Sequence, residues 1–482
     1  MSPGENKETA GCQVPPLVID LDGTLSPADS LWEGLLLLLR ERPACLFLLP
    51  VWLWRGRLPL KYKSLPYSLE QADFMPVRPE ILALIGNARG SGRRVYLATA
   101  APAPLAEKIS SRYAFDGFFA STAELNLKGE AKAAALRRAF GEKGFDYIGD
   151  SKADLPAWLI ARKALSVSPS LMASIRRVNP DCSLLPVRKT SPRDYLGCLR
   201  PHQWIKNLLI VIPLLAAHLF SWEAMLSVLA AIAGFNCCAS AGYMVNDLLD
   251  LRADRSHPVK KRRPFASGAV SIFAAPWIML ALLAGVLLVC LVLPPGFAVW
   301  LVLYVCLSFA YSLYLKGLLM LDVCGLTCLY LLRVAAGGAV LDLRLSNWLL
   351  AFCLFVFLSL ALLKRVGEIK VRSYVTGGGS LPNRAYVRMD KRILEMMSVG
   401  AYFSAAVVLM FYIDSMAATA LYSRPDLLYV LLMIYLFWNG RMLLLASRKE
   451  WGDDPVRFVI QDKSFWVSGL LGLVVFLGAI RL

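Results

Sequence analysis

Three carboxylates lie close together after a long apolar segment: Asp247, Asp250 and Asp254. Their spacing of three and four residues would place them on one face of a helix. Carboxylates in this pattern can hold Mg²⁺ and bridge it to a diphosphate. Acidic residues at the edge of a membrane segment are costly and usually functional. The segment from Asn246 to Asp254 is therefore predicted to bind Mg²⁺ and a diphosphate, in preference to being an ordinary solvated helix end.

A second group of polar residues is spread over the N-terminal third of the chain. Short β-type runs over residues 17–19, 94–98 and 145–148 each end at a carboxylate or a threonine, and a lysine opens a helix between the last two runs. Open α/β sheets place their sites at the carboxyl ends of such strands. The sequence therefore predicts one site here, built from Asp20, Asp22, Thr99, Lys132, Asp150 and Asp154.

The composition indicates that most of the chain lies in a membrane. Of 482 residues, 57% are hydrophobic and 18% are charged, and the mean hydropathy is +0.54, far from the balance of soluble proteins. The formal net charge of +17 comes with no nucleic-acid-binding motif, so basic loops beside membrane helices explain it better. The eleven scattered cysteines fit neither a metal site nor a secreted disulfide framework and predict a reducing compartment.

Nine apolar stretches of spanning or near-spanning length are predicted after Trp204. They cover about 205–220, 223–245, 272–293, 297–315, 319–340, 347–363, 394–412, 427–446 and 465–480. The polar N-terminus does not look like a signal peptide, so the first 190 or so residues are expected in the cytoplasm. Basic residues then concentrate in the loops on that same side, as the positive-inside rule requires. We expect a multi-pass protein of the inner, cytoplasmic membrane.

The N-terminal motifs resemble, in order and spacing, the haloacid dehalogenase superfamily of phosphohydrolases over about residues 15–165. The resemblance makes Asp20 the nucleophile and Asp22 the general acid and base, while Thr99 and Lys132 hold the phosphoryl oxygens. It also makes Asp20, Asp22, Asp150 and Asp154 the residues of a Mg²⁺ site, with Lys128 as a rival for the lysine role. The alternative is a catalytically inactive scaffold.

An insertion at about residues 30–75 separates the first two motifs. In this superfamily an insertion here forms a small helical cap over the active site. Its apolar runs Leu35–Leu39, Leu46–Leu49 and Val51–Trp54 are too short to span a bilayer. They fit either ordinary cap packing or a cap on the membrane surface that receives a lipid-linked substrate. Residues 166–200, rich in Ser, Pro and Arg, are predicted to be a linker.

The membrane half, residues 201–482, resembles the UbiA superfamily of intramembrane prenyltransferases, and within it the decaprenyl-phosphate phosphoribosyltransferases. The resemblance rests on the segments 200–207, 246–264, 311–323, 332–338 and 364–368. Aromatic prenyltransferases of this superfamily carry a second Asp-rich loop after the sixth span. Here that loop is basic, with Lys364 and Arg365, which suits direct contact with phosphate groups.

The resemblance implies a Mg²⁺ site at Asp247, Asp250 and Asp254 on the diphosphate of phosphoribosyl diphosphate. The phosphate-binding and other substrate-binding candidates are Lys206, Asn207, Asn246, Arg263, Lys316, Asp322, Arg333, Lys364, Arg365 and Glu368. For Arg333 and Lys316 the alternative is a long side chain reaching the membrane interface.

The expected function is a bifunctional enzyme of cell-envelope biosynthesis. A UbiA-type domain would transfer 5-phosphoribose from phosphoribosyl diphosphate to polyprenyl phosphate, and the phosphohydrolase domain would remove the 5-phosphate. Two alternatives stay open: prenyl transfer from a prenyl diphosphate to an aromatic or other acceptor, and a non-enzymatic lipid-binding or transport scaffold. The expected partners are the two substrates and the bilayer, with no nucleic acid and with a homo-oligomer as an option.

Overall fold

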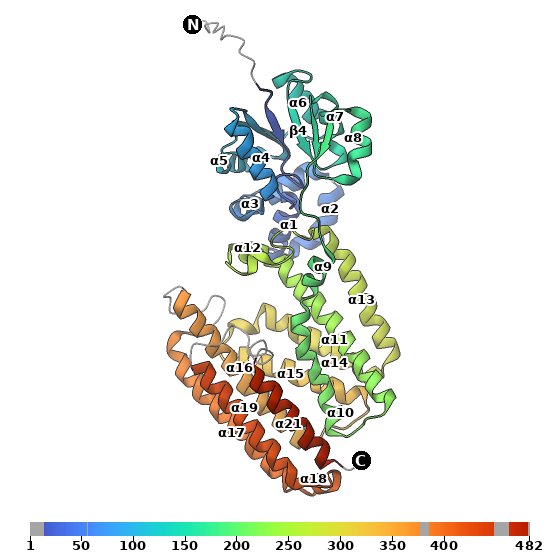
Figure 1. Cartoon of the computed structure of the whole chain (residues 1–482), viewed down its shortest axis with the longest axis vertical. Coiled ribbons are helices and arrows are strands. Elements are labelled where there is room, and N and C mark those ends of the chain that lie inside the picture. Colours follow the sequence, from blue (N-terminus) through green and yellow to red (C-terminus); the bar gives the residue numbers. More distant parts are fainter. Residues whose placement is uncertain (1–13, 55, 376–384, 448–461, 481–482) are drawn as a thin grey trace. The chain divides into compact units, whose positions relative to one another are not determined.

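The structure is a computed structural model that describes residues 14–54, 56–375, 385–447 and 462–480. The chain divides into two compact units (Figure 1). The first combines Met1–Cys198 with Tyr243–Ile278, and the second combines Leu199–Gly242 with Met279–Leu482. The Asp-rich segment is thus grouped with the N-terminal unit, although the sequence analysis assigned it to the membrane half. Each unit is described by itself.

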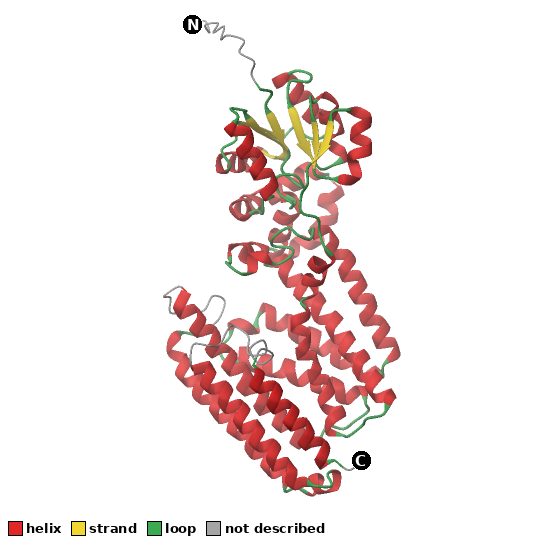
Figure 2. Ribbon diagram, in the orientation of Figure 1, coloured by secondary structure: helices red, strands yellow, loops and turns green. Residues whose placement is uncertain are grey.

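The first unit contains a six-stranded parallel sheet in the order β3-β2-β1-β4-β5-β6 (Figure 2). The strands are β1 (Leu17–Ile19), β2 (Val95–Pro102), β3 (Gly117–Ser121), β4 (Asp146–Gly149), β5 (Ala164–Ser166) and β6 (Cys182–Leu184). Val18 of β1 lies between Tyr96 of β2 and Tyr147 of β4. The apolar runs that predicted strands form the centre of the sheet because both of their faces are buried, as in other parallel sheets.

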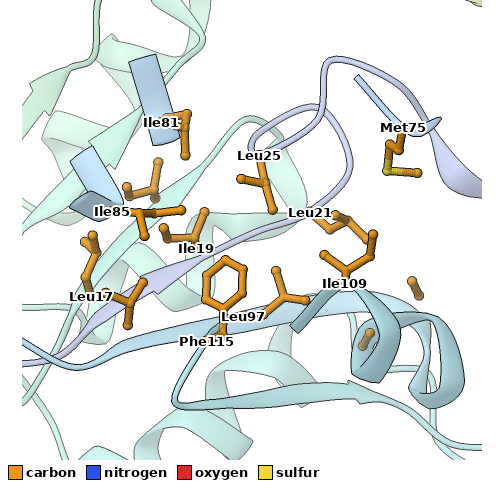
Figure 3. Packing of buried hydrophobic residues seen from close by; sticks show 14 of the residues in the cluster. Leu17, Ile19, Leu21, Leu25, Met75, Ile81, Ile85, Leu97, Ile109 and Phe115 are labelled. Carbon is orange, nitrogen blue, oxygen red and sulfur yellow. The ribbon is translucent and has the colours of Figure 1, made fainter. Parts of the chain in front are cut away.

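Helices cover both faces of this sheet. α4 (Pro79–Gly90) and α5 (Ala103–Arg112) pack on one face, where Ile19, Leu97 and Ile109 are fully buried (Figure 3). On the opposite face lie α6 (Glu130–Phe140), α7 (Leu155–Ile160) and α8 (Met172–Val178), which enclose Val18 and Trp158. The predicted α/β fold is confirmed for this unit.

The sequence analysis expected a linker over residues 166–200, and the structure shows regular elements there instead. α8 packs on the sheet and β6 extends it by pairing with β5, so the domain continues to Leu184. α9 (Pro192–Leu199) follows. These elements are short and carry several Ser and Arg residues. Their stability comes from pairing and packing with distant segments rather than from a local apolar period, which is why the sequence pattern missed them.

The insertion between β1 and β2 is helical, as predicted. It consists of α1 (Ser30–Glu41), η1 (Pro43–Leu48), α2 (Leu49–Trp54), α3 (Arg57–Gln71) and η2 (Ala72–Phe74). The Asp29 carboxylate caps α1 by accepting hydrogen bonds from two backbone N–H groups of its first turn. Leu35 and Leu60 are buried between α1 and α3, whereas Phe47 and Trp54 of η1 and α2 are 84% and 90% exposed.

The second unit is helical. Two helices, α11 (Trp222–Leu249) and α13 (Ala275–Val292), cross the boundary between the units. The other elements of the second unit are η5 (Pro201–Val211), α10 (Ile212–Ala216), α14 (Pro295–Leu313), η8 (Leu315–Gly317), α15 (Leu321–Val340), α16 (Asn347–Val375), η9 (Arg388–Asp390), α17 (Lys391–Ile413), α18 (Met416–Leu421), η10 (Pro425–Leu427), α19 (Leu428–Ser447) and α21 (Lys463–Ala479). α17, α19 and α21 lie side by side (Figure 1). Phe235 and Phe297 are fully buried in the core beside α15.

Seven helices in the described part of the chain are long and apolar enough to cross a membrane. Of the other two stretches that the sequence analysis counted, the first differs from the expectation and the last is a near-spanning helix, as expected. Residues 205–220 form the 3₁₀ helix η5 and the short α10, with Pro201 and Pro213 near their starts, because proline interrupts the backbone hydrogen bonding of a long helix. The last stretch is α21, an apolar helix of 17 residues. The chain is an integral membrane protein.

Candidate functional site

The N-terminal motif residues meet at the carboxyl edge of the sheet. Asp20 follows β1, Thr99 lies in β2, and Asp150 follows β4. β1 lies between the other two strands, and Ile19 pairs with both Leu97 and Ile148, so the three side chains are brought to one level. Gly23 allows the tight turn after Asp20, because its φ is +80° and a Cβ there would lie 2.1 Å from an Asp150 carboxylate oxygen.

Lys132 lies at the centre of the buried polar cluster. Its Nζ is 2.8 Å from Asp20 Oδ1 and 3.0 Å from Asp154 Oδ1, and it donates to the Tyr147 hydroxyl at 2.9 Å. The Tyr147 hydroxyl in turn donates to Asp154 Oδ1 at 2.7 Å. Lys132, rather than its rival Lys128, therefore has the position expected of the phosphate-binding lysine.

Burial sets the protonation of the cluster. It raises the pKa of Asp20 to about 6, although the Lys132 charge opposes this change. Burial and the neighbouring Asp20 and Asp154 charges raise the pKa of Asp150 to about 7. Burial alone would lower the pKa of Lys132, but the charges of Asp20 and Asp154 outweigh it and raise that pKa. Lys132 is thus cationic. The ionised carboxylates of Asp20, Asp150 and Asp154 repel one another unless a further cation binds between them.

A divalent cation fits this arrangement. Asp20, Asp150 and Asp154 each offer an oxygen, and these oxygens all lie within 4.8 Å of one another. Within the described part of the chain this is the one group of three candidate ligands so placed. Oxygen ligands of this kind suit Mg²⁺.

Asp22 lies apart from the three candidate metal ligands. Its Oδ1 accepts a hydrogen bond from Ser30 N at 2.8 Å and its Oδ2 accepts one from Ser30 Oγ at 3.1 Å. Burial, with the Asp29 charge, raises the pKa of Asp22 well above its usual range. A raised pKa favours the protonated carboxyl that a general acid needs, and Asp22 is not among the three candidate metal ligands, so the structure agrees better with the predicted acid–base role than with the predicted metal role.

A cavity of about 400 Å³ opens beside these residues. Its lining includes three polar residues that the sequence analysis did not single out and that lie near the phosphohydrolase motifs: Lys61 from α3, Arg78 and Asn126. Lys61 Nζ donates to Asn126 Oδ1 at 2.8 Å, and the Arg78 guanidinium donates to Gly23 O at 3.3 Å. The charged side chains of Lys61 and Arg78 suit the binding of a phosphate group. They belong to no motif, so only the tertiary structure places them in the site.

The Asp-rich segment is divided between two helices. α11 ends at Leu249, and Asp250 lies between it and α12 (Leu251–Ser256). Asp247 and Asp254 both pair with Arg263 Nη1, at 3.1 and 2.6 Å, and Asp250 pairs with Arg40 Nη1 at 3.1 Å. Among the described residues, these carboxylates do not form a ready group of three metal ligands. Asp247 and Asp254 nevertheless face the same arginine across the break, and the Mg²⁺-binding role of the three carboxylates stays a prediction.

The second unit buries two of the predicted substrate-binding residues together. Arg333 of α15 donates from Nε to Asn207 Oδ1 at 2.8 Å and from Nη2 to the Tyr304 hydroxyl at 3.1 Å. Asn207 Nδ2 donates to Asn236 Oδ1 at 2.7 Å. The Arg333 side chain therefore does not reach the membrane interface, since it is buried in this polar network.

Arg365 of α16 belongs to a second buried network. Its guanidinium pairs with Asp322 of α15 and with Glu368, and it donates to the Tyr311 hydroxyl at 2.7 Å. The Tyr311 hydroxyl donates to Asp322 Oδ1 at 2.7 Å. The side chains of Arg365 and Asp322 are fully buried, so a phosphate could approach this guanidinium only by displacing a carboxylate.

The remaining candidates are partly exposed. Lys206 donates to Gln203 Oε1 at 2.6 Å. Asn246, Lys316 and Lys364 have intermediate burial. The basic loop predicted after the sixth span is wrong, because Lys364 and Arg365 lie within α16. Of these two residues, Lys364 is the more accessible.

Comparisons with known proteins match both halves. Residues 208–468 match the UbiA prenyltransferase family, and residues 17–158 match the haloacid dehalogenase-like hydrolases. An uncharacterized protein of Sinorhizobium fredii is 36% identical over 463 residues, which cover 95% of this chain and 89% of that protein. Nodulation protein NoeC of Azorhizobium caulinodans is 31% identical, covering 58% of this chain and 90% of that protein.

A shorter match covers part of the membrane half. The decaprenyl-phosphate phosphoribosyltransferase of Mycobacterium tuberculosis is 35% identical over 176 residues, which are 36% of this chain and 58% of that protein. Among solved structures, a UbiA homolog from Archaeoglobus fulgidus bound to DMAPP and Mg²⁺ aligns with a TM-score of 0.45 at 14% identity, covering 59% of this chain and 98% of that one.

Proposed function

The chain belongs to the UbiA prenyltransferase family and carries an N-terminal haloacid dehalogenase-like domain, and we propose on this basis that it is a bifunctional membrane enzyme. Its membrane domain transfers 5-phosphoribose from phosphoribosyl diphosphate to polyprenyl phosphate. Its N-terminal domain removes the 5-phosphate from the lipid-linked product. We also propose that the N-terminal domain faces the cytoplasm, because the basic loops favour that side.

The transfer step is supported by the similarity to the mycobacterial phosphoribosyltransferase. That match covers 58% of the relative, so donor and acceptor are part of the proposal. In the reaction the bond between ribose C1 and the diphosphate breaks, and an oxygen of the polyprenyl phosphate forms the new bond to C1. Asp247 and Asp250 are the residues that would hold Mg²⁺, which neutralises charge on the departing diphosphate. Lys364 would bind a further phosphate.

The phosphatase step has the stronger structural support, and the buried cluster around Lys132 carries it. Asp20 Oδ attacks the phosphorus and the bond to the sugar oxygen breaks, while Asp22 donates its proton to that oxygen. Water then attacks the phosphorus of the aspartyl-phosphate, the bond between phosphorus and the Asp20 oxygen breaks to release inorganic phosphate, and Asp22 takes up a proton from the water. Lys132 neutralises charge between Asp20 and the incoming phosphate. Asp20, Asp150 and Asp154 would hold Mg²⁺.

Joining the two activities has a physical advantage. Phosphoribosyl transfer leaves a phosphomonoester on a lipid that stays in the membrane. A phosphatase tethered to the transferase meets that product at a high effective concentration. The final product would be a polyprenyl-phosphoryl ribose.

The test uses the purified full-length protein in lipid vesicles with polyprenyl phosphate, Mg²⁺ and labelled phosphoribosyl diphosphate. The expected product is labelled lipid without the 5-phosphate. Incubation with a prenyl diphosphate and an aromatic acceptor serves as the competing assay. Consumption of the prenyl diphosphate, with no label entering the lipid, would replace the proposal by ordinary prenyl transfer.

A further inference from the structure

The cavity beside Asp20 is not built by the haloacid dehalogenase-like domain alone. One of its walls comes from residues 265–273, which follow the Asp-rich motif in the sequence and belong to the same compact unit. Phe265, Val270, Ile272 and Phe273 of this segment line the cavity. We call residues 265–273 the wall segment. A single-domain phosphohydrolase would have no counterpart to it.

A buried ion pair anchors the wall segment to the cap. Arg255 of α12 binds Glu33 of α1 in a bidentate manner, with distances of 2.6 and 2.7 Å, and donates from Nε to Ala266 O at 2.9 Å. Both charged side chains are almost fully buried, at 3% and 2% exposed. Breaking such a pair leaves an uncompensated buried charge, which makes the arrangement costly to lose.

The backbone of the wall segment also follows a defined path. Gly268 has a φ of +72°, and a Cβ at this position would lie 2.4 Å from Pro27 Cγ. Ala269 O accepts a hydrogen bond from Thr190 Oγ1 at 2.8 Å. Three separate contacts therefore hold the wall segment against the N-terminal domain, as expected for a permanent part of the cavity.

The lining of the cavity combines polar and apolar side chains. Asp20, Lys61 and Lys132 belong to its polar lining, whereas Trp32 of the cap and Phe273 of the wall segment form an apolar part, with ring centroids 5.9 Å apart in an edge-to-face arrangement. A volume of about 400 Å³ suits a phosphosugar head group and is too small for a polyprenyl chain.

From this polarity, and resting on the proposed function, we infer that the phosphatase selects an amphiphilic phosphomonoester. The phosphate of the substrate binds beside Asp20 and Lys132, and the part of the substrate nearest the lipid contacts Trp32 and Phe273. These two aromatic residues determine specificity. They contribute little to the binding of a small soluble phosphomonoester, which has no lipid part to contact them.

The test compares two substrates in the full-length protein: lipid-linked 5-phosphoribose and free ribose 5-phosphate. We expect Trp32→Ala and Phe273→Ala each to lower kcat/KM for the lipid-linked substrate by about tenfold, the loss of one large apolar contact, and to change kcat/KM for ribose 5-phosphate by less than about twofold. Phe273→Leu should restore much of the loss. Phe74→Ala, at a half-exposed residue of the cap that does not line the cavity, is the matched control.

Equal losses on both substrates, or no loss on either, would overturn the specificity role even if the parent enzyme dephosphorylates the lipid. If the parent enzyme hydrolyses ribose 5-phosphate but leaves the lipid-linked substrate untouched, the specificity inference fails and the proposed coupling of the two activities fails with it. The experiment therefore separates failure of the specificity inference alone from failure of the proposed coupling of the two activities.

A different observation concerns the outer surface of the cap. Phe47 and Trp54 are 84% and 90% exposed, and four neighbouring leucine and valine side chains are also exposed: Leu46, Leu48, Val51 and Leu53. The surrounding sequence from Arg42 to Lys63 contains five basic residues and no acidic residue. An apolar surface of this size is unusual on a soluble protein.

We propose that this surface, residues 43–54, inserts into the head-group region of an anionic bilayer. The segment is too short to span, and an apolar face with flanking cations is typical of helices that lie in the interface. The rest of the chain is anchored in a membrane by its spanning helices, so a bilayer is always within reach.

Photo-cross-linking of the full-length protein in nanodiscs tests this. A benzophenone amino acid replacing Trp54 should form lipid adducts, and more of them with phosphatidylglycerol than with phosphatidylcholine. The same probe replacing Leu125, which is 54% exposed elsewhere in the unit, is the control. Adducts to protein alone at position 54, or equal lipid labelling at both positions, would contradict the proposal.

Discussion

The two groups of carboxylates in this chain differ in what neutralises them. Asp20 follows β1, Asp150 and Asp154 follow β4 at the same edge of the sheet, and a single lysine lies among them. In the Asp-rich segment, Asp247 and Asp254 share Arg263, whereas Asp250 is paired with Arg40. The first group offers three oxygens within 4.8 Å of one another, and the carboxylates of the second group do not form such a group of three.

The difference shows where each site gets its geometry. Strand ends are fixed by the sheet, so the first group is organised before any ligand binds, at the cost of burying carboxylates that repel one another. The Asp-rich segment contains a helix break, and its carboxylates are satisfied by Arg40 and Arg263. A diphosphate with Mg²⁺ could exchange partners there, with arginine moving from carboxylate to phosphate.

The largest expected effect is the loss of phosphatase activity in the variant Asp20→Asn. An amide is a far poorer nucleophile, so dephosphorylation should fall on the order of 10⁴-fold or more, while phosphoribosyl transfer continues. Mass spectrometry should then show a lipid product heavier by one phosphate than that of the parent. Asp73→Asn, at an exposed residue of the cap, is the control. An unchanged product mass in Asp20→Asn would contradict the assignment.

The next effect separates the second group of carboxylates from the first. Asp247→Asn and Asp250→Asn should each lower Mg²⁺-dependent transfer by about a hundredfold or more, equivalent to about 2.7 kcal/mol, and leave hydrolysis of ribose 5-phosphate within about twofold of the parent. The measurement is label incorporated into lipid, with Asp426→Asn, an exposed residue, as the control. Transfer within a factor of about three of the parent would remove these residues from the site.

A third prediction distinguishes substrate binding from stability at the basic residues Lys364 and Arg365 of α16. Arg365→Gln leaves the buried Asp322 without its charged partner and should destabilise the protein by about 3–5 kcal/mol, seen as a lower Tm in detergent. Lys364→Gln should leave the Tm nearly unchanged and raise the KM for phosphoribosyl diphosphate. If Lys364→Gln leaves the KM unchanged, Lys364 serves only as a positive-inside anchor.

A fourth prediction concerns pH. The folded-state pKa values of Asp20 and Asp150 are raised from 3.8 to about 6 and about 7. The metal-free protein therefore loses stability as pH rises from about 4 to about 7, and the same deprotonation supplies ligands for Mg²⁺. The increase in Tm caused by Mg²⁺ should therefore be larger at pH 8 than at pH 6. Asp150→Asn should greatly reduce that difference, and an equal Mg²⁺ effect at both pH values would contradict it.

The smallest effect is expected at Arg40. Its ion pair with Asp250 is between half-exposed side chains, so Arg40→Gln should change stability by less than about 1 kcal/mol. It also frees one carboxylate of the Asp-rich segment, so the Mg²⁺ concentration for half-maximal transfer should fall slightly. A higher Mg²⁺ requirement in this variant would show that Arg40 assists the site rather than competing with the cation.

The sequence alone determined which chemistry each half could perform. The runs ending at Asp20, Thr99 and Asp150 predicted strands and a common edge, because apolar β-type segments must be buried and their ends must then meet. Hydropathy predicted the membrane half, since a bilayer forces long apolar helices. The length and hydropathy of residues 205–220 did not show that this stretch forms two short helices, because the division depends on the backbone geometry around Pro201 and Pro213.

Only the tertiary structure decided which side chains meet. Arg40 and Lys61 belong to no motif, and Arg255 had no predicted role, yet they lie against Asp250, Asn126 and Glu33 because distant segments pack together. The same packing makes residues 265–273 a wall of the cavity beside Asp20. The tertiary structure also shows that the helix is interrupted at Asp250, where the spacing alone had predicted a continuous helix. Contacts between segments far apart in the chain leave no local pattern, so the sequence names the reacting groups and the fold selects their partners.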